Sequence, residues 1–183
     1  MITTTLNAIS NHGLSPSSWS KLLQHLGKTK ADDELLPLVT VLDSNGLDDA
    51  LWCCRCLPQY DRLWRLFAVY CARRVQHLMT DPRSVAVIDV AEKYANGQAT
   101  KQELAAAYFD GAFTFTTSVF SSTSSVFAAA AAVDAANADA AAAAVTASDG
   151  SALTFSSAAA VAGERVAQSD AFRLLITTGE LPK

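Results

Sequence analysis

Charge is scarce in this sequence of 183 residues, and neither sign is concentrated. Charged residues make up 17% of the chain, the formal net charge is −4, and the pI is about 5.2. Proteins that bind nucleic-acid phosphates or anionic membrane surfaces usually carry an excess of lysine and arginine. The composition therefore argues against a nucleic acid as the partner of this chain.

Long apolar runs are also lacking. The first ten residues have neither the basic start nor the apolar stretch of a secretory signal. The tract 128–145 is long enough to cross a membrane, but it is mostly alanine and is interrupted by Asp134, Asn137 and Asp139. We therefore expect no membrane association and a cytoplasmic location.

Cysteine is rare, and its positions do not indicate a reactive or metal-binding site. The four cysteines are Cys53, Cys54, Cys56 and Cys71. They lie in segments predicted to be helical, whereas disulfide frameworks spread cysteines among loops and zinc sites take paired ligands from turns. Cys71 and His77 are about one and two-thirds helical turns apart, a poor spacing for a nucleophile and its base. We expect buried, reduced thiols, with no metal and no cofactor.

Catalytic motifs are absent as well. The sequence contains no glycine-rich phosphate loop, no dinucleotide-binding fingerprint and no Gly-x-Ser-x-Gly motif. The paired carboxylates Asp32/Asp33 and Asp48/Asp49 lie at predicted helix starts, where the helix dipole stabilises anions. We therefore predict no catalytic residue and no enzymatic activity.

What the sequence does contain is a series of helix signals. Ser15-Pro16 and Gly27 are typical of the two ends of a helix, and Thr100 with Glu103 forms a capping box. Strand signals are absent from the first 108 residues. Apolar spacing and caps predict helices at 16–26, 35–42, 48–57, 61–79, 82–95 and from 100 onward.

The segment 61–79 is the best candidate for the central helix. It is apolar on nearly all sides, as expected for a helix in the middle of a bundle. Only the pair Arg73 and Arg74 interrupts this pattern in its second half. We expect these two arginines to reach the surface or an acidic partner.

The C-terminal part differs in character. Phe113, Phe120 and Phe127 recur every seven residues, and valines recur with the same step. This pattern predicts a helix with a Phe/Val seam that packs on the bundle or on a second copy. The alternation within 113–119 also fits a strand, but the pattern continues through an alanine-only unit that favours helix. Two further helices are expected at 151–168 and 170–178.

These patterns predict an all-α fold. We expect a compact multi-helix bundle over residues 1–108. An alanine-rich helical region with a heptad-like Phe/Val seam, residues 109–183, then packs on the core or mediates oligomerisation.

Several phrases between Leu47 and Ala107 resemble a known family. They are LDDALWCCRCLP, DRLWRLFAVYCARRVQHLMTDPRS, VAEKYANGQAT and KQELAAA, and they cover about a third of the chain. The phrases are similar to bacterial and prophage-encoded helical proteins that are labelled immunity proteins, by likeness to the antidotes of polymorphic toxins. The resemblance implies a helical, non-catalytic protein. Similar phage sequences continue with alanine repeats that carry Asp, Arg and Trp, whereas this chain carries Phe, Val, Ser and Thr.

The expected function is therefore inhibition by binding. A protein of this type would occupy a toxin, a defence effector (as an anti-CRISPR protein does) or another host protein. The candidate contact residues are Asp48, Asp49, Arg73, Arg74, Phe113, Phe120 and Phe127. The alternative is a self-assembling structural protein in which the phenylalanine stripe builds a homo-oligomer.

Overall fold

The computed structural model describes residues 1–78, 82–113 and 158–182. These residues form an all-α, multi-helix fold with one short pair of strands, which confirms the predicted fold class. The Phe/Val seam beyond Phe113 lies outside the described residues. The helices are α1 (Leu6–Asn11), α2 (Pro16–Leu26), α3 (Leu38–Asn45), α4 (Leu47–Cys53), α5 (Asp61–Val75), α6 (Pro82–Ala95), α7 (Lys101–Phe113) and α10 (Ala158–Thr178).

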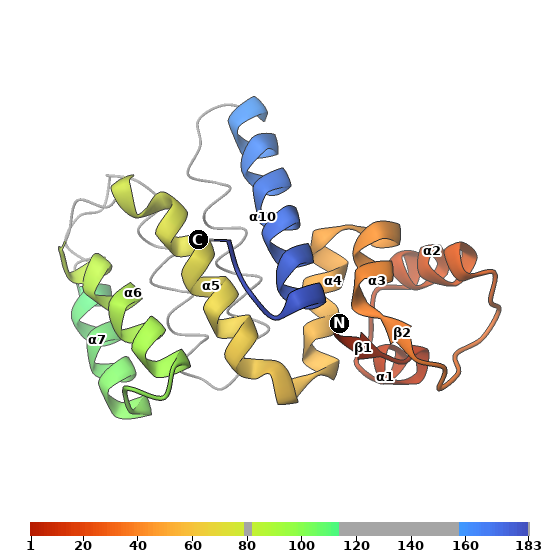
Figure 1. Cartoon of the computed structure of the whole chain (residues 1–183), viewed down its shortest axis with the longest axis horizontal. Coiled ribbons are helices and arrows are strands. Elements are labelled where there is room, and N and C mark those ends of the chain that lie inside the picture. Colours follow the sequence, from red (N-terminus) through yellow and green to blue (C-terminus); the bar gives the residue numbers. More distant parts are fainter. Residues whose placement is uncertain (79–81, 114–157, 183) are drawn as a thin grey trace.

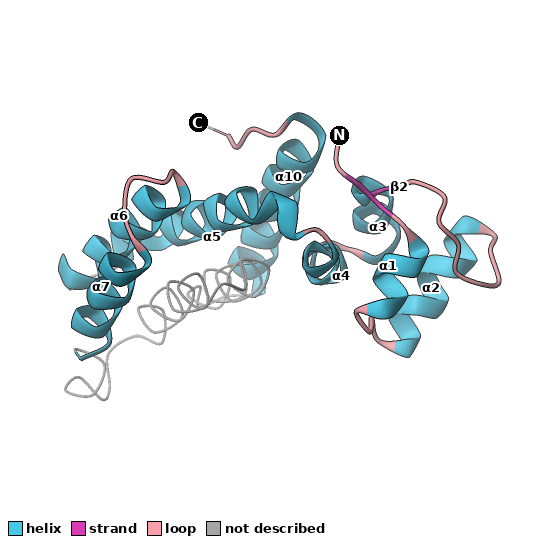
Figure 2. Cartoon of the chain, turned by 90° about the horizontal axis from the view of Figure 1, so that it is seen from below, coloured by secondary structure: helices cyan, strands magenta, loops and turns pink. Residues whose placement is uncertain are grey.

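The helices are arranged in an elongated row. The hairpin of α6 and α7 lies at one end, the N-terminal helices α1 and α2 lie at the other, and α5, α10 and α4 lie between them (Figures 1 and 2). The long helix α10 follows all of these elements in the sequence, yet it packs among α3, α4 and α5. Its position makes it the link between the two ends of the row.

Local capping signals place three helix boundaries where the sequence predicts them. Ser15 Oγ accepts a hydrogen bond from the Ser18 N–H at 3.2 Å, and Gly27 ends α2 in the left-handed region at φ 64°. Before α7, the Thr100 N–H donates to the Glu103 carboxylate at 2.6 Å, and the Glu103 N–H donates back to Thr100 Oγ1 at 3.2 Å. These are the two reciprocal bonds of a capping box.

The prediction for the start of the second helix is wrong, and so is the prediction that this part of the chain has no strands. Residues 35–42 do not form one helix, because β1 (Thr3–Thr4) pairs antiparallel with β2 (Leu36–Pro37) and α3 begins only at Leu38. The acidic run before it does not cap a helix either. Asp32 instead binds Lys28 Nζ at 2.7 Å, and its carbonyl accepts a hydrogen bond from the Asn7 N–H at 3.0 Å.

Three other helix boundaries also differ from the prediction. The helix expected at 48–57 is α-helical only to Cys53 and continues as a 3-10 turn, and the helix expected at 61–79 makes the same change after Val75. The short helix α1 has no counterpart in the prediction. The break expected between 168 and 170 is not present, because residues 158–178 form the single helix α10, whose last two turns are buried in the core; residues 151–157 lie outside the described residues.

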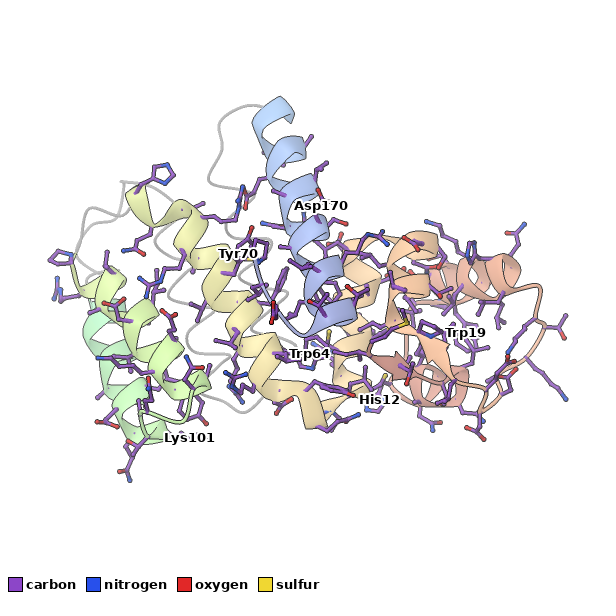
Figure 3. All side chains as sticks on the ribbon, viewed as in Figure 1. His12, Trp19, Trp64, Tyr70, Lys101 and Asp170 are labelled. Carbon is purple, nitrogen blue, oxygen red and sulfur yellow. The ribbon has the colours of Figure 1, made fainter. Side chains whose placement is uncertain are left out.

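The centre of the core lies between α5 and α10. Trp64 and Phe67 of α5 and Phe172 of α10 are fully buried. The ring centroids of Phe67 and Phe172 are 5.1 Å apart in an edge-to-face arrangement, and those of Trp64 and Phe172 are 6.0 Å apart. Figure 3 shows Trp64 and Tyr70 along the part of α5 that lies next to α10. Residues 158–182 therefore share one hydrophobic core with the N-terminal helices.

The N-terminal residues are also attached to α10. The Ile2 N–H donates to the Ile176 carbonyl at 2.8 Å, and the Ile2 carbonyl accepts a hydrogen bond from the Leu38 N–H at 3.0 Å. Ile2 is buried together with Ile176. Among the helices of the described residues, none combines the length and the apolar character that crossing a lipid bilayer requires.

Candidate functional site

The most deeply buried charge of the described residues lies between α5 and α10. Glu164 of α10 is only 2% exposed at its side chain, and it accepts hydrogen bonds from Arg74 Nε at 2.8 and 2.9 Å. The buried amide of Gln168 donates to the same carboxylate at 3.2 Å. Donation of these hydrogen bonds to the Glu164 carboxylate raises the pKa of Arg74 above its already high ordinary value. The geometry is that of a structural ion pair that fixes α10 on α5.

Arg73 makes the equivalent link on the other side of α5. Its Nη2 lies 2.7 Å from Asp89 Oδ1 and 2.6 Å from Glu92 Oε2, both on α6. The sequence predicts that Arg73 and Arg74 reach the surface or an acidic partner. The structure shows that each arginine has its acidic groups within the same chain, on α6 for one and on α10 for the other.

Asp48, one of the predicted acidic contact residues, also forms an ion pair with α10. Asp48, in the first turn of α4, lies 3.1 Å from Arg165 Nη2, and a second ion pair joins Asp43 of α3 to Arg173. Asp48 and Arg74 therefore bind adjacent residues of α10, Arg165 and Glu164. Asp48 and Arg74 are far apart in the sequence, and the C-terminal helix brings them together. This helix lies beside α3, α4 and α5 in Figure 1.

The remaining predicted contact residues have different surroundings. Asp49 accepts a hydrogen bond from Asn45 Nδ2 at 2.8 Å, and the same amide donates to the Ser18 carbonyl at 2.8 Å, so Asp49 helps to attach α2 to α3 and α4. Phe113 is the last residue of α7. Phe120 and Phe127 lie outside the described residues.

One arginine–tryptophan pair on α4 was not predicted as a contact site. The guanidinium carbon of Arg55 lies 3.9 Å from the centroid of the Trp52 ring, a close cation–π contact. Both residues are half-buried. Trp52 Nε1 and Arg55 Nε are buried, and neither has a hydrogen-bond partner among the described residues. A buried donor without an acceptor costs about 1–3 kcal/mol. The contact between Trp52 and Arg55 contains two such donors, so hydrogen-bond acceptors are missing at this point.

Trp52 and Arg55 share one side of the chain with Asp48. The residues follow one another at steps of four and three, which places them on one face of α4 and its 3-10 extension. We call Asp48, Trp52 and Arg55 the α4 face. Asp48 is 74% exposed at its side chain, so the face reaches solvent at that end. The spacing of Asp48, Trp52 and Arg55 is the signal by which the sequence could have revealed this site.

The four cysteines, three of them beside Trp52 and Arg55 in the sequence, have little nucleophilic character. All four thiols are free; Cys53, Cys54 and Cys71 are buried, and Cys56 is half-buried. Burial raises the pKa of Cys53, Cys54 and Cys71 far above the usual range, and raises the pKa of Cys56 to about 11. Near neutral pH these thiols are protonated, and a protonated thiol is a poor nucleophile and metal ligand.

Within residues 1–78, 82–113 and 158–182, no three histidine, cysteine or acidic side chains are grouped as a metal site would require. Comparisons with protein-family models, with curated proteins and with solved structures gave no match.

Proposed function

We propose that this chain is a non-catalytic binding protein that inhibits or neutralises a protein partner through the α4 face. The proposed biological class is a phage- or prophage-borne inhibitor. Its target would be a bacterial toxin, a defence effector of the kind that anti-CRISPR proteins block, or another host protein. The class rests on the resemblance of the segment between Leu47 and Ala107 to immunity-type proteins, and the α4 face lies within that segment.

The unpaired Arg55–Trp52 contact carries the proposal. Tryptophan and arginine are the residues most enriched among those that dominate the binding energy of protein interfaces. Here the two are stacked on each other, half-buried, and left with two donors that no described residue uses. A partner that supplied acceptors at this point would gain hydrogen bonds without having to separate an existing ion pair.

The thiol chemistry supports binding rather than catalysis. Cys71 and His77 are a possible nucleophile and a possible base in the sequence, but the two lie in different environments. Cys71 is fully buried with a raised pKa, whereas His77 is exposed in the 3-10 turn after α5. A buried, protonated thiol does not attack a substrate in solution.

Affinity capture with matched variants tests this function. The tagged wild-type chain, Arg55→Ala and Lys101→Ala would be incubated with lysates of phage-infected and uninfected bacteria. Lys101 is an exposed cation at the start of α7, far from α4 along the row (Figure 3), so its removal controls for the loss of one positive charge.

The expected result is a protein that the wild type and Lys101→Ala retain at a fixed ratio to the tagged chain and that Arg55→Ala does not retain. The activity of this captured protein should fall when the purified chain is added at a concentration equal to that of the captured protein. Retention that is equal for all three variants would refute the α4 face as the binding surface. Turnover of a substrate by the purified chain alone would refute the non-catalytic function.

A further inference from the structure

Arg55 differs from the other arginines of the chain in its electrostatic surroundings. The other seven each have a partner in the structure: Arg62, Arg65, Arg73, Arg74, Arg83, Arg165 and Arg173. Arg55 has only the face of the Trp52 ring, with no carboxylate, amide or carbonyl acceptor among the described residues. The Nε of this half-buried guanidinium is a buried donor without an acceptor.

The donors beside it define what would complete the site. Trp52 Nε1–H and the guanidinium N–H groups are donors only, so a ligand must bring acceptors and no donors. A carboxylate has two oxygens that accept hydrogen bonds from more than one N–H, and its negative charge neutralises the guanidinium. The guanidinium carbon lies 3.9 Å from the centroid of the Trp52 ring, so the donors of both side chains are within reach of a carboxylate at the edge of this stack.

We infer that Arg55 and Trp52 form a recognition site for a single carboxylate, supplied by an aspartate or glutamate side chain of the protein partner. This inference rests on the proposed function and adds the chemistry of the contact. Because Trp52 Nε1 and Arg55 Nε are buried, the inference requires the guanidinium to shift on the Trp52 ring before a carboxylate can reach both.

The neighbouring charges favour an isolated carboxylate over a polyanion. Asp48 lies on the same face, and Asp49 is the next residue along the helix. Asp48 is paired with Arg165, which leaves the charge of Arg55 available to one anion. A nucleic-acid backbone would bring several negative charges toward these aspartates, and such like-charge contacts oppose binding. An acidic protein side chain avoids this repulsion.

Peptide titration followed by NMR tests the inference directly. The full chain, labelled with ¹⁵N, has three indole N–H signals, from Trp19, Trp52 and Trp64. The signal that disappears in a Trp52→Phe variant is that of Trp52. The probes are an acetylated, amidated peptide with two adjacent glutamates, its glutamine counterpart, and inorganic phosphate. The expected result is a saturable shift of the Trp52 indole and Arg55 Nε–H signals with the glutamate peptide alone, while Trp64 stays unchanged.

Two variants sharpen the test. Arg55→Lys keeps the charge but removes the planar set of donors, and it should weaken glutamate-peptide binding about tenfold. Trp52→Phe keeps an aromatic surface and removes the N–H, with an expected loss of about three- to tenfold. Equal shifts with the glutamine peptide, or unchanged affinity in Arg55→Lys, would overturn the inference.

The outcomes separate this inference from the proposed function. A partner protein captured through Arg55 with no response to the glutamate peptide would overturn carboxylate recognition and leave the binding function standing. A selective shift with the glutamate peptide together with no captured protein would support the site and refute the function. Shifts of equal size with phosphate would also overturn the inference, because they would show a general anion site.

Discussion

Replacing Arg74 by methionine should destabilise the chain much more than replacing Glu164 by glutamine, although both changes break the same ion pair. The side chain of Glu164 is 2% exposed, whereas that of Arg74 is 34% exposed. Without Arg74, the carboxylate stays in the core with only the Gln168 amide beside it. Without the charge of Glu164, the arginine can still turn toward water.

The burial of the two groups sets the size of the difference. Breaking a buried pair by removing one partner costs about 3–5 kcal/mol, and we expect Arg74→Met to fall in this range. We expect Glu164→Gln to cost about 1–2 kcal/mol, because the amide oxygen still accepts a hydrogen bond from Arg74 and the exposed part of the guanidinium is solvated. In the Glu164→Gln background, Arg74→Met should cost less than half of its value in the wild type.

Urea unfolding, followed by tryptophan fluorescence, measures these free energies, because Trp64 lies against Phe172 of α10. For a chain of this length, Arg74→Met should lower the Tm by about 10 °C. Arg173→Met is the matched control, since it removes an arginine from the half-exposed pair with Asp43 and should cost about 0–1 kcal/mol. If Arg74→Met cost no more than Glu164→Gln or the control, the assignment of a buried ion pair as the attachment of α10 would be refuted.

Three further predictions concern other parts of the chain. Alkylation at pH 8 should modify only Cys56 in the folded protein, about a hundredfold more slowly than a free thiol because its pKa is about 11; rapid labelling of Cys53 or Cys71 would contradict this. Hydrogen bonds from Thr100 lower the pKa of Glu103, so its support of α7 is complete above its usual pKa and is lost as the pH falls through the lowered value. Carbon chemical shifts of the first turn should report that loss, and Glu103→Ala should abolish its pH dependence. Asp48→Asn should weaken the attachment of α10 slightly without unfolding the chain, as amide exchange in α10 would show, since the pair with Arg165 is exposed.

The sequence predicts those features of the fold that depend on neighbouring residues. Ser15 and Gly27 fix the ends of α2, and Thr100 with Glu103 fixes the start of α7, because each cap is made within a few residues. The two strands could not be predicted in this way. Each has two residues, and Thr4 pairs with Leu36, so the information lies in a contact between distant parts of the chain.

The same difference between local and long-range contacts decides which parts of the candidate site can be predicted. Arg73, Arg74 and Asp48 are recognisable as charged positions on helices, but their partners on α6 and α10 become visible only in the folded chain. The α4 face is different, since Trp52 and Arg55 are three residues apart and Asp48 is one turn earlier. Helical spacing alone brings these three together, but the cysteines between Trp52 and Arg55 favour a core role for the same segment, so the sequence pattern does not single out the face.

The position of α10 in the core has a consequence for synthesis of the protein. Phe172 follows Phe67 by roughly a hundred residues, so the N-terminal helices leave the ribosome long before the side chain that covers Trp64 and Phe67 exists. Until then these rings are exposed to other nascent chains and to chaperones. The long-range closure also raises the contact order, which slows folding. Ribosome-bound chains that stop before residue 158 should therefore be recognised by chaperones, and chains whose helix α10 has left the ribosome should escape them.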